Sequence, residues 1–182
     1  MQRLLLCHFK EFIGTLFLTI LIRKNKSVTN NENLVETLND LVRINNDRIT
    51  GYEKAAAQAE SIDVDLIVIF KKMASESRDY IRQLDEKVLS LGGQPSADST
   101  FAGKIYRTWM DVKNTFTGSD RTSILGSCEF GEDAAQTAYN DALQSDTEMD
   151  ATTRQLIMEQ KTSLKNSHDI IKKYRDLNQA VD

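Results

Sequence analysis

The sequence has little of what several fold classes need. It holds a single Pro and 8 Gly among 182 residues, too few turn-forming residues for a β-sandwich, which needs a turn about every 8 to 12 residues. The two Cys stand far apart in the sequence, as do the two His, without the close pairs that a zinc finger or ribbon needs. Cys7 and Cys128 stand in unlike surroundings, which argues against a disulfide scaffold. These shortages favour one all-α domain.

An excess of positive charge is also missing. The 23 Lys and Arg residues against 27 Asp and Glu give a net charge of −4, whereas nucleic-acid binding draws on clustered Lys and Arg. We therefore expect no nucleic-acid partner. The sequence has no phosphate loop, dinucleotide-binding motif, H-E-x-x-H or G-x-S-x-G, so it indicates an architecture more firmly than a reaction.

Residues 1–29 differ from the rest of the chain. Residues 12–22 form an apolar run that is followed by Arg23, Lys24 and Lys26. A helix over this run would be about 16 Å long, roughly half of a bilayer core. Two interpretations stay open. We prefer an appended, poorly structured extension outside the fold, and the alternative is that residues 4–26 tether the chain to a membrane. Either way, we expect the domain at residues 30–182 to be cytoplasmic.

Two stretches in the first half of this domain have apolar residues three or four positions apart, as on one face of a helix. The first begins at Asn30 and runs to Ala59. The second follows Asp63, whose side chain can cap it, and stops at Gly92 and Gly93. The short turn between the stretches predicts an antiparallel helical hairpin.

The second half repeats this organisation. One helical stripe covers Leu125–Ala142, and another covers Ile157–Ile171 and includes His168 on its predicted inner face. Asp146 and Asp150 are the candidate caps of the last helix. Because the connection is again short, these two helices are expected to form a second hairpin.

The link between the hairpins, residues 92–118, is long. It can run the length of a helix, which makes the second and third helices parallel, as in ferritin-like bundles. Within it, residues 101–116 have helical spacing and predict a short helix across the bundle, with Trp109 as a packing anchor. The predicted fold class is therefore all-α, a ferritin-like four-helix bundle with a long crossover that carries a short extra helix.

Carboxylates beside the predicted inner faces are the candidate functional groups. Glu53, Glu76, Glu129 and Glu132 lie on three helices and His168 on the fourth. Di-iron bundles take a carboxylate from each of two helices and Glu-x-x-His from each of the others, and this sequence has no Glu-x-x-His. A complete ferroxidase centre is disfavoured. A degenerate site for iron, manganese or zinc stays open beside the structural role that we favour, in which these side chains pair with Lys or Arg.

Five motifs add a family resemblance. In chain order they are LNDL at 38–41 with GYE at 51–53, LGG at 91–93, RTWMD at 107–111, CEFGED at 128–133 and HD at 168–169. Together they resemble a bacterial ferritin-like family known as domain of unknown function 2383, over about residues 33–178. The resemblance implies a fold related to ferritins and rubrerythrins. It also implies that Glu53, Glu76, Glu129 and Glu132 match positions where such proteins carry metal-binding carboxylates.

Together, these features predict a non-catalytic bundle that acts through association with a protein partner or with further copies of itself. The relatives suggest a part in a stress response. The alternative is a metal-binding protein with a degenerate ferritin-type site made of the four glutamates and His168.

Overall fold

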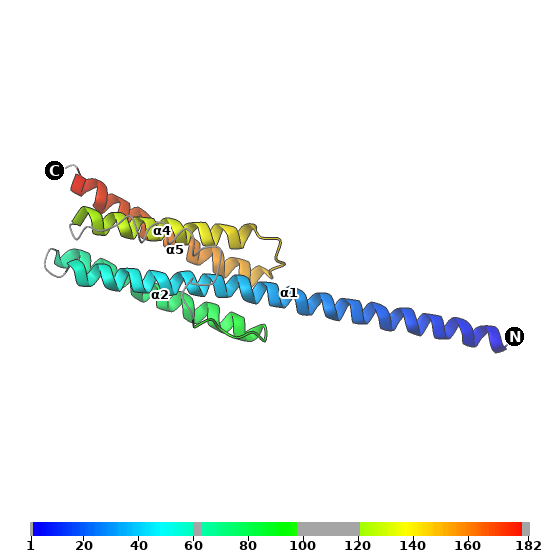
Figure 1. The fold of residues 1–182 in the computed structure, drawn as a ribbon. Coiled ribbons are helices and arrows are strands. Elements are labelled where there is room, and N and C mark those ends of the chain that lie inside the picture. The colour runs from blue at the N-terminus through cyan, green and yellow to red at the C-terminus, as the bar shows by residue number, and fades with distance from the viewer. Residues whose placement is uncertain (1, 60–62, 98–120, 180–182) are drawn as a thin grey trace.

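The computed structural model describes residues 2–59, 63–97 and 121–179, which form helices and short connections without any strand (Figure 1). The helices are α1 (Gln2–Ala59), α2 (Val64–Ser90), α4 (Arg121–Gln144) and α5 (Ala151–Gln179). The predicted all-α, four-helix fold is confirmed. The predicted helix at residues 101–116, with Trp109 and most of the crossover, lies outside the described residues.

The helices form a bundle of two antiparallel hairpins. α1 packs against α2 and α4, α4 packs against α5, and α2 contacts α5. Figure 1 shows that α2 and α4 run in the same direction while the partners within each hairpin run in opposite directions. This is the topology that the long link between the hairpins predicts.

Side-chain caps fix the starts of α2 and α5. Asp63 accepts hydrogen bonds from the backbone N–H groups of Asp65 and Leu66, at 2.9 and 3.3 Å. Asp150 accepts one from the N–H of Thr153 at 2.6 Å, so it is the cap of α5 and Asp146 is not. Such caps satisfy backbone donors that have no partner inside the helix.

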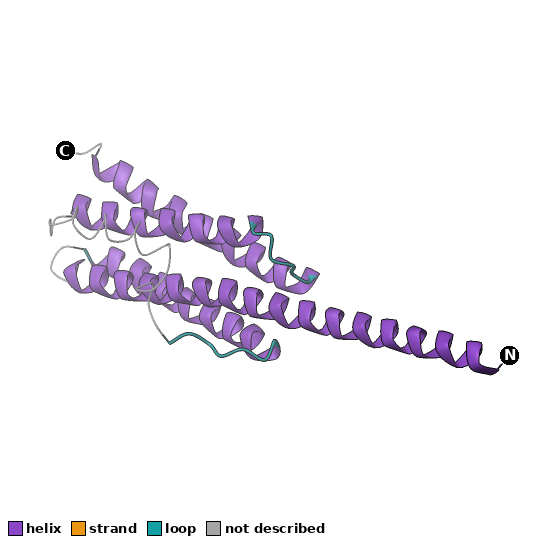
Figure 2. Cartoon of the chain, turned by 45° about the vertical axis from the view of Figure 1, so that its right-hand side comes forward, coloured by secondary structure: helices purple, strands orange, loops and turns teal. Residues whose placement is uncertain are grey.

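α1 begins much earlier than its apolar stripe. It is helical from Gln2, so the expectation of a poorly structured segment at residues 1–29 is wrong for the backbone of residues 2–29. The reason is visible in the sequence: no Pro interrupts this stretch and Gly14 is its only Gly, so nothing stops the helix from continuing. Figures 1 and 2 show this half of α1 projecting beyond the ends of the other helices. Within the described residues, none of the helices combines the length and apolar character needed to cross a bilayer.

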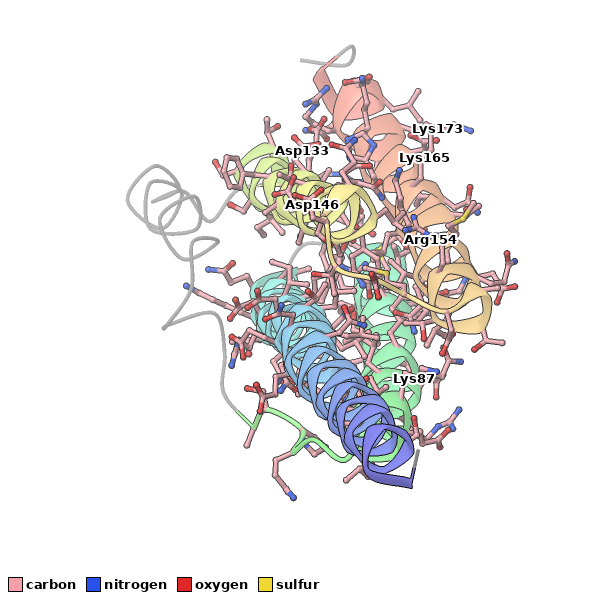
Figure 3. The ribbon with its side chains drawn as sticks, turned by 90° about the vertical axis from the view of Figure 1, so that its right-hand side faces the viewer. Lys87, Asp133, Asp146, Arg154, Lys165 and Lys173 are labelled. Atoms are coloured by element: carbon pink, nitrogen blue, oxygen red, sulfur yellow. The ribbon has the colours of Figure 1, made fainter. Side chains whose placement is uncertain are left out.

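The core consists of two apolar clusters along the bundle axis. One includes Leu38, Leu84, Tyr139 and Leu164, and the other includes Phe70, Leu125 and Ile171. Figure 3 looks along the bundle and shows side chains filling the space between the four helices, with the labelled Asp133, Lys165 and Lys173 on the outside. Burial of this apolar surface is the main force that holds the hairpins together.

Candidate functional site

A layer of buried polar side chains separates the two apolar clusters. Each helix contributes one residue to it: Arg48 from α1, Ser77 from α2, Glu132 from α4 and Ser167 from α5, all at most 4% exposed. In every helix this residue falls between the residues of one cluster and those of the other. We call these four residues the mid-layer. Buried polar groups are costly unless they are paired, so their contacts define the candidate site.

Arg48 and Glu132 form a buried ion pair at the centre of the mid-layer. Arg48 Nη2 lies 2.5 Å from Glu132 Oε1, and the two side chains are 1% and 0% exposed. Arg48 Nη1 also donates to Ser77 Oγ at 2.5 Å. One guanidinium therefore links α1, α2 and α4. Burial opposes its charge, but the attraction of Glu132 outweighs this and raises the pKa of Arg48 above its usual value.

Tyr52 completes the surroundings of Glu132. Its hydroxyl donates to Glu132 Oε1, the same oxygen that Arg48 contacts, and the Arg48 guanidinium lies 5.5 Å from the centre of its ring. Burial, and then the charge of Glu132, raise the pKa of Tyr52 well above its usual value. Glu132 Oε2 is also buried, and it has no hydrogen-bond partner within the described part of the chain.

A second polar chain lies on the side of the mid-layer that faces the first cluster. Asn45 Nδ2 donates to Tyr139 Oη at 2.8 Å, and Tyr139 donates to Gln160 Oε1 at 2.7 Å. Gln160 Nε2 then donates to Gln83 Oε1 at 2.9 Å. These bonds cross from α1 through α4 and α5 to α2, and they fix the register of all four helices.

Two of the predicted metal-binding residues lie toward the surface of the first hairpin. Glu53 forms an ion pair with Arg78, and its side chain is 57% exposed. Glu76 lies 3.6 Å from Lys72 Nζ, and its side chain is 29% exposed. Neither residue is buried, whereas the adjacent Tyr52 and Ser77 are.

The other predicted residues divide between surface and core. Glu129 pairs with Arg175 across the second hairpin. His168 Nε2 lies 3.1 Å from Asp133 Oδ1 at the edge between α4 and α5, so its placement on the inner face was wrong. Ser167 takes that position, three residues after Leu164, where the pattern allowed either three or four. Of the five predicted residues, only Glu132 lies in the core.

The arginine of the central ion pair was missed. Arg48 is almost fully buried, while its apolar neighbour Ile49 is only partly buried. Arginine is rarely buried, so hydropathy alone places it outside. The available signal was the helical spacing: Arg48 is four residues after Ile44 and four before Tyr52, and both of these are buried.

These residues do not fit the two-metal centre that a ferritin-like fold implies. Such a centre needs several carboxylates and imidazoles around the metals, but in the described residues no three His, Cys, Asp or Glu side chains come together in a way that could hold a metal ion. The carboxylate at the bundle centre faces an arginine, which is a permanent cation. We derive no metal chemistry from this arrangement.

Comparisons with known proteins agree with the architecture. The family model of the domain of unknown function DUF2383 matches residues 33–145. Similar solved structures include a Dps1 mutant from Mycobacterium smegmatis, with a TM-score of 0.69 and 12% identity over 81% of this chain and 97% of that one. Another is the bacterioferritin-related dodecameric thioferritin of Bacteroides fragilis, with a TM-score of 0.67 and 18% identity over 86% and 96%. No curated protein matches the sequence significantly.

Proposed function

For a chain that belongs to the DUF2383 family and has a ferritin-like fold, we propose a non-catalytic role in protein association, with further copies of itself as the partner. The observation that carries this proposal is the projecting half of α1. Residues 2–29 continue the helix for about 42 Å at 1.5 Å per residue, beyond the ends of the other described helices (Figure 1).

The sequence of residues 2–29 favours a helix that packs against a partner. Residues 12–22 are almost entirely apolar, and a helix that is apolar on all sides is normally buried in protein or lipid. In proteins, most of the stability of a helix comes from the packing of its apolar residues. A partner that packs along this segment would bury its apolar run and stabilise the helix.

The charges around the apolar run favour a protein over a lipid bilayer as the partner that buries it. Lys10 and Glu11 precede it and Arg23 and Lys24 follow it, so only about 16 Å of helix lies between charged groups, against a bilayer core of about 30 Å. Two copies that overlap along their projecting helices would bury the run and leave both charged ends in water. The thioferritin neighbour is described as dodecameric, which is consistent with assembly by proteins of this fold.

The contacts of the predicted site residues support a non-catalytic role. Glu53 and Glu129 each pair with an arginine at or near the surface. His168 lies against Asp133, and Glu132 is held by Arg48. Groups that do chemistry are instead directed at a shared space where a substrate can bind. An oxidase activity that disappears in Glu132→Ala would contradict the proposal.

Sedimentation velocity on the full chain tests the association. We expect the natural chain to sediment as an assembly and the variant Leu16→Asp/Ile20→Asp to sediment near the 20.6 kDa monomer, because its charges lie one turn apart on the apolar segment. Thr15→Asp/Thr19→Asp adds the same charges at the two polar positions of the run and is expected to preserve the assembly.

Two results would overturn this proposal. One is a natural chain that is monomeric at every concentration. The other is a natural chain that floats with vesicles of anionic phospholipid, loses this binding in Leu16→Asp/Ile20→Asp, and does not self-associate, because the partner of the segment would then be a membrane.

A further inference from the structure

The mid-layer lies in the core between the two apolar clusters, and the side chain of Arg48 links three helices there. Arg48 contacts Glu132 on α4 and Ser77 on α2, both at 2.5 Å. Arginine keeps its proton in proteins, so this charge does not depend on pH in the range where the protein is folded. The guanidinium therefore neutralises the buried carboxylate permanently.

We propose that Arg48 takes the place of a metal cation in this bundle: it completes the centre without metal and keeps divalent cations away from Glu132. This inference is independent of the self-association proposed above, which rests on the projecting half of α1.

The contacts of Glu132 explain how cations are kept away. Its Oε1 already accepts hydrogen bonds from Arg48 and Tyr52, and a metal ion would have to displace both donors. Its Oε2 has no hydrogen-bond partner within the described part of the chain, but a cation bound there would lie against the positive charge of Arg48. At such separations, repulsion between like charges in a buried site is large.

The same geometry predicts what the loss of Arg48 would create. Cys128 lies one helical turn before Glu132 on the same face of α4, and both are buried. A shortened side chain at position 48 leaves a space beside a carboxylate that no longer has a cation. Carboxylate oxygen and thiolate sulfur are both ligands of Zn²⁺ and Co²⁺, so this carboxylate and thiol form half of a tetrahedral site.

Metal titration of the full-length chain tests the proposal. The natural chain, incubated with Zn²⁺ or Co²⁺ and desalted, is expected to retain no metal by elemental mass spectrometry, and its unfolding midpoint is expected not to change. Arg48→Ala is expected to retain metal. Its midpoint should rise by about 5 °C when Zn²⁺ stands about 100-fold above its Kd, and bound Co²⁺ should give a thiolate absorption band.

Matched variants identify the ligands. Arg48→Ala/Glu132→Gln and Arg48→Ala/Cys128→Ser should each lose the midpoint shift, and the second should also lose the Co²⁺ band. Arg43→Ala removes an arginine from the same helix, one that pairs with Glu36 and Asp40, and should retain no metal. Residues Cys7 and His8 are kept in every variant, so any metal that they bind is common to all.

Three results would overturn the proposal. The natural chain could retain near-stoichiometric metal that Glu132→Gln loses, or folded Arg48→Ala could retain none. Arg48→Ala could also fail to fold both with and without Zn²⁺, while Arg48→Met/Glu132→Met, which removes both charges, folds normally. If Arg48→Ala folds only when Zn²⁺ is present, the proposal is supported in its strongest form.

Discussion

The thiol of Cys128 is buried beside a carboxylate, and both features suppress its ionisation. The residue is 8% exposed, and burial, followed by the charge of Glu132, raises the pKa of the thiol well above its usual 9.0. Since the thiolate is the reactive form, Cys128 is a packing residue in the folded chain. Because the folded chain holds the Cys128 proton more tightly than the unfolded chain does, the neutral thiol stabilises the fold. This stabilisation is present below about pH 9 and is lost as the pH rises further.

We therefore expect Cys128 to be unreactive toward dithionitrobenzoate. In a Cys7→Ser background at pH 8, the folded chain should react about 100-fold or more slowly than the same chain in urea, because each unit of pKa lowers the thiolate fraction tenfold. Raising the pH from 7 to 9 should increase the thiolate fraction, and with it the reaction rate, in both states, and the unfolded chain should stay the faster of the two. Comparable rates with and without urea would show that the thiol is accessible and ionises normally.

The roles of single residues were predictable where the side-chain type and its position in the sequence point to the same role. Asp63 was predictable as a cap, and Asp150 as one of two candidates, because short acidic side chains are preferred directly before a helix. Arg48 and His168 were not, since the pattern fixes an inner face only to within one position and a buried ion pair has no signature in either partner alone. Their roles became clear from three-dimensional contacts.

At the scale of elements, two glycines with different roles end α2. Gly92 has a φ of 80°, in the left-handed region that favours glycine. Its N–H bonds to the carbonyl of Leu89, and that of Gly93 bonds to the carbonyl of Val88, both at 3.0 Å, which is the Schellman arrangement. Gly93 also lies so close to α1 that a Cβ would come within 2.6 Å of Val35.

Gly93→Ala is expected to destabilise the chain by about 1 to 3 kcal/mol, because the added methyl group meets the branched side chain of Val35 and overpacks the contact with α1. Urea unfolding followed by circular dichroism measures this. Gly51→Ala is the control: it lies inside α1, and a Cβ there would meet no atom within 4 Å, so the better helix former should stabilise by up to about 1 kcal/mol. Equal effects of the two substitutions would contradict the close approach at Gly93.

A helix end was predictable where the sequence places helix-breaking residues at it. The Gly92–Gly93 end of α2 was predicted because glycines there end a long apolar stripe. The start of α1 was not, because the apolar stripe of the bundle begins near Leu34 while the helix itself needs no stripe to continue toward Gln2. Periodicity reports which residues are buried, and it does not report where a helix begins.

At the scale of the molecule, the mid-layer divides the bundle into two packing units. Ile157 belongs to one apolar cluster and Ile171 to the other, and both are fully buried. They are 14 residues apart on α5, about 21 Å along the helix axis. Substitutions in the two clusters should therefore act independently.

Ile157→Val and Ile171→Val are each expected to lower the free energy of unfolding by about 1 kcal/mol through the loss of one buried methylene. The double variant should lose the sum to within about 0.5 kcal/mol, as for sites that share no partner. Chemical denaturation of the four chains measures the coupling. A coupling clearly above that limit would show that packing is continuous across the mid-layer.

Connection lengths explain why the order of helices was predictable. Two short turns and one long link allow few arrangements, and the described helices adopt the expected one. The candidate site was less predictable, because which carboxylate reaches the centre depends on the rotation of each helix. A shift of one residue turns a helix by about 100° and moves a side chain from the core to the surface.

The unbroken course of α1 has a mechanical consequence. The residue that holds the mid-layer together, Arg48, lies on the same helix as the projecting segment, and no described break separates them. An α-helix is stiff over such distances. A partner that binds the start of α1 therefore fixes the orientation of the whole bundle and holds the bundle about 42 Å from the binding point.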